Sequence, residues 1–229
     1  MAKFLVAKLA DDKLSNSLAS KLRKRRFLLF RSLFSTVKMP LKIVDIGGRK
    51  TIWEREGFCD YAPEEVEILV TNIEACDLEE GQPHSNIKTM VADATDMNQF
   101  GDEAFDIVYS NSVIEHLSTY ENQSRMADEV QRLGKRYFLQ TPNRNFPIEP
   151  HFLFPFFQFL PFDLRVWMLT HFPVGWCPKI ADRQAAIDLL KTFRLMTKQE
   201  LLILFPNATL YEEKFLGLTK SFVVYEGWN

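Results

Sequence analysis

Short apolar runs rich in β-branched residues alternate with helical stretches through the first two thirds of the chain, and this alternation limits the fold more than any other feature. Regular β–α alternation predicts a parallel sheet covered by helices on both faces. The clearest helical stretch is Asn122–Leu133. The predicted strands are Leu41–Ile46, Val66–Ile73, Ile87–Ala92, Phe105–Ser110 and Arg136–Gln140.

The end of the chain follows a different pattern. After a predicted helix at Met196–Phe205, two further strands at Thr209–Leu216 and Ser221–Glu226 lie close together around Gly217. Such spacing predicts a hairpin, so we expect the sheet to finish with an antiparallel pair.

Two segments depart from the alternation and define the expected organisation. Residues 1–39 are a basic, helical extension that ends before Pro40, and residues 40–229 form the α/β domain. Within that domain, residues 145–195 are an insert rich in Phe, Pro and Trp. A chain of this length can bury one sizeable core.

Charge is divided unevenly along the chain. Residues 1–38 hold ten Lys and Arg against two Asp, whereas the remaining 191 residues carry 18 basic and 28 acidic side chains. An acidic body argues against a broad nucleic-acid surface, which needs clustered positive charge. It does not exclude a small anionic substrate.

Cysteine usage and apolar runs indicate a cytoplasmic protein. Cys59, Cys76 and Cys177 lack a CxxC spacing, so we expect reduced thiols. The apolar run within Met1–Ala10 is too short for a signal peptide. The eleven residues of Phe152–Phe162 include two prolines and are too few to span a bilayer.

A glycine turn follows the first predicted strand. Asp45 and Ile46 lead into Gly47 and Gly48, and glycines there let the backbone approach a ligand closely. Ligands of open α/β sheets bind at this end of the strands. The later glycines of a dinucleotide GxGxxG motif are absent.

Polar residues also end the next three strands. Asn72 follows the second strand, where a polar group can bind ribose hydroxyls. Asp93 ends the third strand and could accept the amine of an adenine, with the backbone N–H of Ala94 beside it. Asn111 ends the fourth strand, so one extended ligand could touch all of these strand ends.

The stretches VDIGG, VTNIE, VADATD and FDIVYSNSVIEHL, in this order, resemble the class I S-adenosylmethionine-dependent methyltransferases over about residues 40–229. The resemblance implies a Rossmann-like sheet of seven strands in the order 3-2-1-4-5-7-6, with strand 7 antiparallel, and S-adenosylmethionine as cofactor. Arg49 and Thr51 stand where the family has further glycines, and Asn72 stands where it has an acid, with Glu74 two residues later. The implied contacts are Asp45, Gly47 and Gly48 to the methionine part, Asn72 to the ribose, Asp93 and Ala94 to the adenine, and Asn111 to the sulfonium side.

A narrower resemblance points to the quinone-biosynthesis O-methyltransferases. Their E-x-x-E-H and T-x-N-R-N stretches correspond to Ser112–His116 and Thr141–Asn145. Because Ser112 replaces the first acid of that subgroup's metal site, no metal is expected.

His151 and His116 are the candidate catalytic residues. They follow the fifth and fourth strands, so both could line an acceptor pocket, where a base helps an acceptor that must lose a proton. Glu115 and Glu149 could orient the two imidazoles. The alternative is that both histidines pack or bond locally, without a part in catalysis.

The insert suggests the nature of the acceptor. Its aromatic residues predict a lid over an apolar pocket. The acceptor is then expected to be a small or lipid-like molecule, methylated at O or N. The alternative is a satellite core beneath a long insertion, but the lid is favoured because insertions after strand five shape the substrate side in this fold. Two alternatives for the whole chain remain: a catalytically inactive S-adenosylmethionine-binding module and a nicotinamide-dependent oxidoreductase.

The basic extension carries a leucine stripe. Five leucines fall within about 100° on a helical wheel, with basic residues around them. Such a helix could contact an anionic membrane surface, or fold over the cofactor cleft. The oligomeric state is not predictable from the sequence. The leucines are Leu14, Leu18, Leu22, Leu29 and Leu33.

Overall fold

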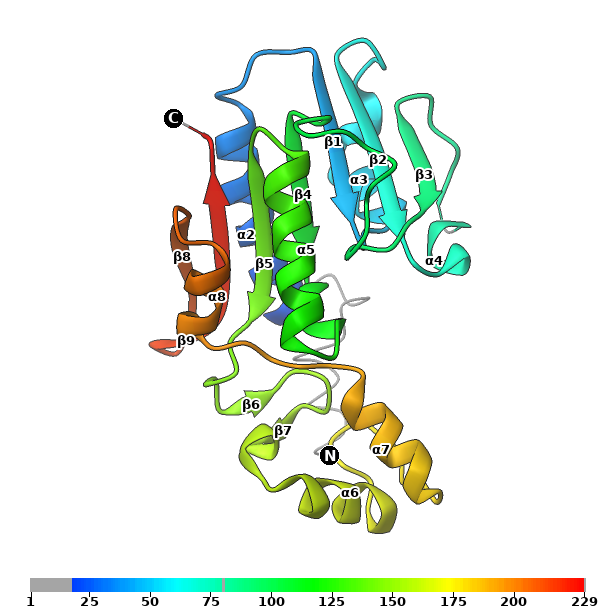
Figure 1. Cartoon of the computed structure of the whole chain (residues 1–229), viewed down its shortest axis with the longest axis vertical. Coiled ribbons are helices and arrows are strands. Elements are labelled where there is room, and N and C mark those ends of the chain that lie inside the picture. The colour runs from blue at the N-terminus through cyan, green and yellow to red at the C-terminus, as the bar shows by residue number, and fades with distance from the viewer. Residues whose placement is uncertain (1–17, 80, 229) are drawn as a thin grey trace.

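The computed structural model describes residues 18–79 and 81–228, and within these residues seven strands form one mixed sheet (Figure 1). The strand order is β3-β2-β1-β4-β5-β9-β8. Each predicted strand is present, with its ends shifted by a few residues at most. The strands are β1 Leu41–Ile46, β2 Val66–Asn72, β3 Ile87–Val91, β4 Ile107–Asn111, β5 Tyr137–Pro142, β8 Thr209–Phe215 and β9 Leu218–Glu226.

The pairing confirms the predicted seven-stranded methyltransferase sheet. β1 to β5 pair in parallel, whereas β9 is antiparallel to both of its neighbours, β5 and β8. β8 and β9 are therefore strands 6 and 7 of the expected order. This arrangement brings the carboxyl ends of β1 to β5 to a single edge of the sheet.

Helices cover both faces of the sheet. α5 and α8 lie over one face, where Met126, Val130 and Leu201 join the buried strand residues. α2 and α3 lie over the other face, where Phe30 and Trp53 are fully buried. Outside the insert the helices are α2 Leu18–Phe34, α3 Lys50–Arg55, α4 Ala75–Glu79, α5 Tyr120–Leu133 and α8 Lys198–Leu204, with 3-10 turns η1 Phe58–Asp60 and η2 Ile114–His116.

The insert lies beyond the carboxyl end of β5, at the lower end of Figure 1. It has a small core of its own, built around Phe152, Phe157 and Leu169. Phe156, Trp167 and other aromatic side chains of the insert remain exposed. Its elements are β6 Ile148–Glu149, β7 Phe154–Pro155, η3 Phe157–Phe159, α6 Phe162–His171 and α7 Arg183–Lys191.

Helix α2 uses aromatic side chains, not leucines, to pack against the sheet. Phe27, Phe30 and Phe34 are buried, and the Phe30 ring centroid lies 4.9 Å from that of Tyr109. Their spacing places them on one helical face, and each ring buries more apolar area than a leucine. Leu29 and Leu33 of the predicted stripe are only half-buried beside this cluster, whereas Leu14 and the side chains of Leu18 and Leu22 lie outside the described residues.

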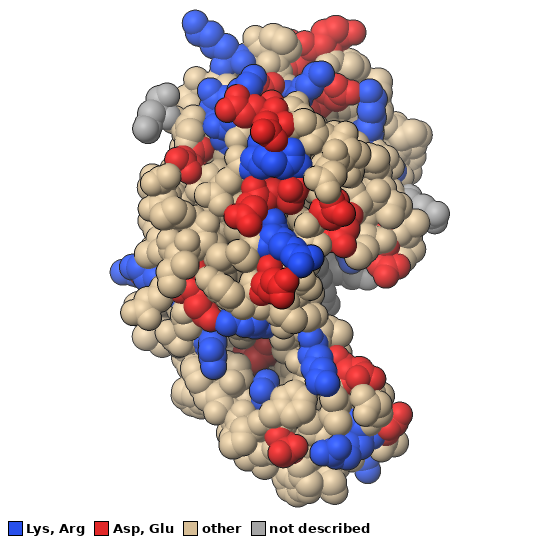
Figure 2. Space-filling model, in the orientation of Figure 1, with Lys and Arg blue, Asp and Glu red and all other residues tan. Residues whose placement is uncertain are grey.

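Over residues 27–34 the extension packs on the sheet itself, while a membrane contact of the extension as a whole stays a prediction. Here α2 covers a face of the sheet, so its buried aromatic rings are not available to a membrane surface. In the described part of the chain, no helix combines the length and apolar character needed to cross a bilayer. On the face shown in Figure 2, basic and acidic side chains alternate over the main domain.

We predict that Phe30→Ala lowers the free energy of unfolding by about 3–5 kcal/mol, because it leaves a cavity among buried rings. Leu28→Ala, on the same helix but 55% exposed, should change it by no more than about 0.5 kcal/mol. Urea unfolding of both variants measures the difference. Equal, small effects would show that α2 is not part of the folded core.

Candidate active site

In the loop after β1, the backbone of two glycines lies close to two side chains. Gly47 has φ 71°, and a Cβ atom there would lie 2.5 Å from a methyl group of Val113. A Cβ on Gly48 would lie 1.8 Å from Oδ2 of Asp45. Both positions thus require glycine, and α3 begins two residues after them.

Asp45 is held in an aromatic environment. Its side chain is 1% exposed, and Trp53 Nε1 donates a hydrogen bond of 2.7 Å to its Oδ2. Burial raises the pKa of Asp45 to about 7, although the bond from Trp53 acts in the opposite direction. Burial and the nearby Asp45 also raise the pKa of Tyr109.

Asn72 connects the end of β2 to the glycine loop. Its Nδ2 donates to the carbonyl oxygen of Gly48 at 3.3 Å, and its Oδ1 accepts from the backbone N–H of Glu74 at 3.3 Å. Each atom makes a single bond, so the amide keeps a second N–H and a second lone pair for a ribose hydroxyl. The exposed Glu74 is the nearest carboxylate along the chain that could share this task.

Asp93 lies exposed after β3. Its Oδ1 accepts 2.8 Å hydrogen bonds from both the backbone N–H and the hydroxyl of Thr95, which fixes the carboxylate orientation. Ala94 and Asn111 are half-buried, and Asn111 is the last residue of β4. The structure therefore places the predicted cofactor residues at neighbouring strand ends along one edge of the sheet.

His151 and His116 lie together although they follow different strands. Their ring centroids are 5.1 Å apart, and the rings are nearly perpendicular. His151 Nδ1 lies 2.7 Å from Oε1 of the buried Glu149, and its ring stacks on Phe193 at 4.2 Å. When Glu149 is ionised it can only accept, so Nδ1 carries the hydrogen and Nε2 of the neutral ring is free to take a proton.

The two glutamates differ in what they contact. Glu149 orients His151, while its Oε2 accepts from the backbone N–H of Phe152 at 2.7 Å. Glu115 is bonded instead to the hydroxyl of Thr141 at 3.0 Å, and burial raises its pKa to about 7. Burial and the neighbouring His151 lower the pKa of His116.

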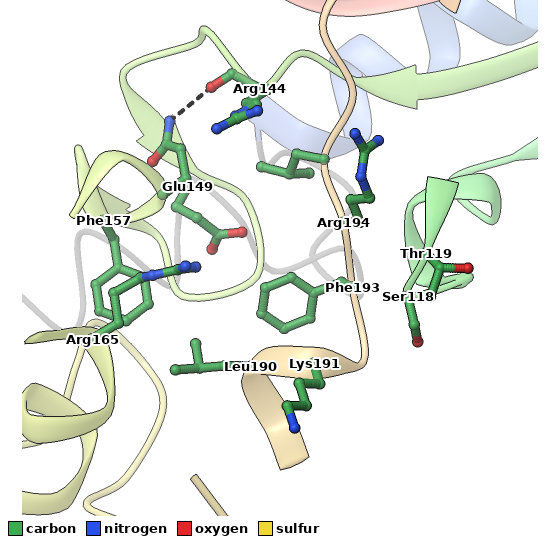
Figure 3. A pocket seen from close by; sticks show the side chains of 12 residues that line it. Ser118, Thr119, Arg144, Glu149, Phe157, Arg165, Leu190, Lys191, Phe193 and Arg194 are labelled. Atoms are coloured by element: carbon green, nitrogen blue, oxygen red, sulfur yellow. Dashed lines mark hydrogen bonds between the residues drawn. The ribbon is translucent and has the colours of Figure 1, made fainter. Parts of the chain in front are cut away.

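A cavity of about 490 Å³ opens between the insert and the start of α5 (Figure 3). Glu149 and Phe193, which touch His151, lie in its wall. Four basic side chains share this wall, and they are not evident from the sequence because they come from separate segments with no common spacing. They are Arg144, Arg165, Lys191 and Arg194.

Comparison with known proteins agrees with this geometry. Residues 58–137 match the family model of a methyltransferase domain. The structure resembles an S-adenosylmethionine-dependent methyltransferase from Methanosarcina mazei, with 14% identity, a TM-score of 0.52 and coverage of 84% of this chain and 94% of that one. The chain has the fold of the class I S-adenosylmethionine-dependent methyltransferases.

Two further solved structures share this methyltransferase fold. A protein from Pyrococcus horikoshii is 17% identical with a TM-score of 0.54, and the match covers 96% of this chain and 94% of that chain. The carbon methyltransferase CurJ is 13% identical with a TM-score of 0.55, and the match covers 98% of this chain and 66% of that chain. A search of curated proteins found no match.

The residues at the strand ends fit S-adenosylmethionine. Gly47 and Gly48 let the loop pack tightly at the end of β1, since a Cβ atom at either position would clash with Val113 or Asp45. The exposed carboxylate of Asp93 can accept an amine, and Asn111 lies beside the turn to η2.

We predict that Asp45→Asn reduces the pH dependence of stability. Because the folded-state pKa is raised from 3.8 to about 7, the folded protein holds an extra proton between these values, and the stability it contributes is lost as the pH rises through that window. The loss amounts to at most about 1.4 kcal/mol per pH unit. Urea unfolding from pH 4.5 to 8 should show a flatter curve for Asp45→Asn.

The exposed Asp128 on α5 provides the control, since Asp128→Asn should leave the curve parallel to that of the unaltered protein. Glu115 contributes a slope of the same sign and persists in both variants. Parallel curves for all three proteins would mean that Asp45 is ionised in the folded state.

Proposed function

We propose that this protein transfers a methyl group from S-adenosylmethionine to a small or lipid-like acceptor, at oxygen or nitrogen. The observation that carries the proposal is the shared edge of the sheet, where the glycine loop and the polar strand ends lie next to the His151–Glu149 pair. S-adenosylmethionine supplies an electrophilic methyl group when bound. The residues of the chain hold the acceptor in line and take up its proton.

A short stretch of chain joins the two parts of this site. Val113 contacts Gly47 of the cofactor loop, and η2 follows directly and ends with His116. His116 in turn lies against His151. An acceptor beside these imidazoles would thus lie close to the methionine end of the cofactor site.

In the proposed reaction a lone pair of the acceptor oxygen or nitrogen forms the new bond to the methyl carbon, while the electrons of the carbon–sulfur bond remain on sulfur. Nε2 of His151 accepts the acceptor proton. Glu149 keeps the ring in the tautomer that leaves Nε2 unprotonated.

Asp93→Ala should weaken the binding of S-adenosylmethionine roughly tenfold or more, because it removes a charged acceptor for the adenine amine. Isothermal titration calorimetry measures this change. Asp128→Ala, at an exposed position of α5, is the matched control and should bind normally. Unchanged affinity of Asp93→Ala would refute the placement of the adenine.

His151→Ala should lower turnover roughly 10²–10⁴-fold if the imidazole is the general base, with little change in cofactor affinity. His171→Ala is the control, because His171 lies exposed on α6 and bonds the backbone of Trp167. Full activity of His151→Ala on the true acceptor would overturn the assignment, and His116 would be tested next.

The acceptor itself can be found by transfer of a labelled methyl group into a cell extract, followed by mass spectrometry of the product. Labelled tRNA or DNA, without a labelled small molecule, would contradict the proposed class of acceptor. Binding of S-adenosylmethionine without transfer to any component would favour an inactive binding module.

A further inference from the structure

The cavity beside His151 has more positive than negative charge in its wall. Figure 3 shows Arg144, just after β5, and Arg165 of α6 at the cavity, with Arg194 and Lys191 on the chain around the end of α7. Among its described lining residues Glu149 alone carries a carboxylate. The cavity is about 490 Å³, a volume suited to a small molecule.

Two of the charged groups in this wall are already engaged. Glu149 contacts His151 and the backbone of Phe152. Arg194 forms an ion pair with Glu200 and donates a 2.8 Å hydrogen bond to Gln123. Glu149 is thus not a ready partner for the other cations of the cavity, and Arg194 already has a carboxylate of its own.

In the part of the chain that the structure describes, the remaining cations have no acidic partner at bonding distance. Within the described residues, no salt bridge involves Arg144, Arg165 or Lys191. Arg165 lies over the ring of Phe162 at 5.5 Å, which leaves its donors available. Burial and the charge of Arg144 lower the pKa of Arg165, while Glu149 acts in the opposite direction.

Arg165 also has an unsatisfied buried donor. Its Nε is buried and has no hydrogen-bond partner, and the same is true of Oε1 of Gln158 in the same wall. An unpaired buried polar group is costly, and a guanidinium satisfies its donors best with an oxyanion that accepts two parallel bonds. The orphaned acceptor on Gln158 suits a hydroxyl group beside that anion.

The rest of the wall is apolar. Phe157, Leu190 and Leu195 contribute aliphatic and aromatic surface, and Phe193 lies between the cavity and His151, on which it stacks. A ligand with its anion at Arg165 would therefore place an apolar part against Phe193, the ring that stacks on the proposed base.

We propose that this cavity binds an oxyanion, a carboxylate or a phosphate monoester, through Arg165 and Arg144, and that the methyl acceptor is a small amphiphile that carries such a group. This inference rests on the proposed methyltransferase function. The methylated atom is a second oxygen or nitrogen of the acceptor, near His151, and the oxyanion serves to orient it.

The binding test uses phenyl phosphate and phenylacetate as probes, with benzyl alcohol as the neutral comparison. Calorimetry without S-adenosylmethionine should show that the unaltered protein binds the anions and not the alcohol. Arg165→Met, which keeps an apolar stem, should weaken anion binding roughly 10- to 100-fold. Arg183→Met is the control, since Arg183 is exposed on α7 and pairs with Asp163.

Arg144→Met provides a second variant with the same expected loss, should Arg165→Met fold poorly by thermal melting. Failure of both anions to bind the unaltered protein, or equal binding by Arg165→Met, Arg144→Met and the unaltered protein, would overturn the inference. Equal binding of benzyl alcohol would overturn it as well, since the site would then not select an anion.

An assay of methyl transfer distinguishes failure of this inference from failure of the proposed function. With the acceptor found in an extract, Arg165→Met should raise KM and leave kcat largely unchanged. Undiminished kcat/KM in Arg165→Met would refute the anion contact and leave the methyltransferase function standing. Loss of anion binding in a protein that methylates nothing would support the site and refute the function.

Discussion

The hydrogen bond between Trp53 and the buried carboxyl of Asp45 connects the core to the proposed cofactor site. Asp45 fills the space that a Cβ on Gly48 would need, so the position of the carboxyl depends on glycine at residue 48. On its other side, Trp53 packs edge-on against Phe30 of α2. The amino-terminal helix is thus coupled, through one indole ring, to the loop that we propose contacts the methionine end of the cofactor.

The acceptor side is assembled from two strands and the insert that follows the second. β4 leads through Val113 into η2 and His116, whereas β5 leads into the insert and to His151. The chain then returns from α7 and bonds the backbone of Glu115 through the N–H of Arg194. The segment that carries His116 is thus bonded to the end of the insert that carries His151. The two imidazole rings lie 5.1 Å apart, centroid to centroid.

The strands and the positions of the strand-end residues were predictable, because hydrophobic periodicity and glycine turns are local signals. The strand order was implied only by the resemblance to the methyltransferases. The sequence predicted that His116 and His151 follow strands that end at the same edge of the sheet. It did not predict that their rings are in contact. The aromatic face of α2 was not, since a leucine stripe is visible on the same helix and only the sheet decides which side packs. The bond from Trp53 to Asp45 and the basic cavity wall depend on contacts between distant segments, which no spacing in the sequence encodes.

Glu149 has two roles, because it contacts the proposed base His151 and is also part of the cavity wall. A buried carboxylate is stable only when it is paired and hydrogen-bonded, and Glu149 has both His151 and the N–H of Phe152. Its field also stabilises the charged form of Arg165, which burial opposes. One carboxylate cannot satisfy Arg144 and Arg165 while it also fixes the tautomer of His151. The proposed acceptor anion supplies the missing countercharge, which leaves Glu149 to fix the tautomer of His151.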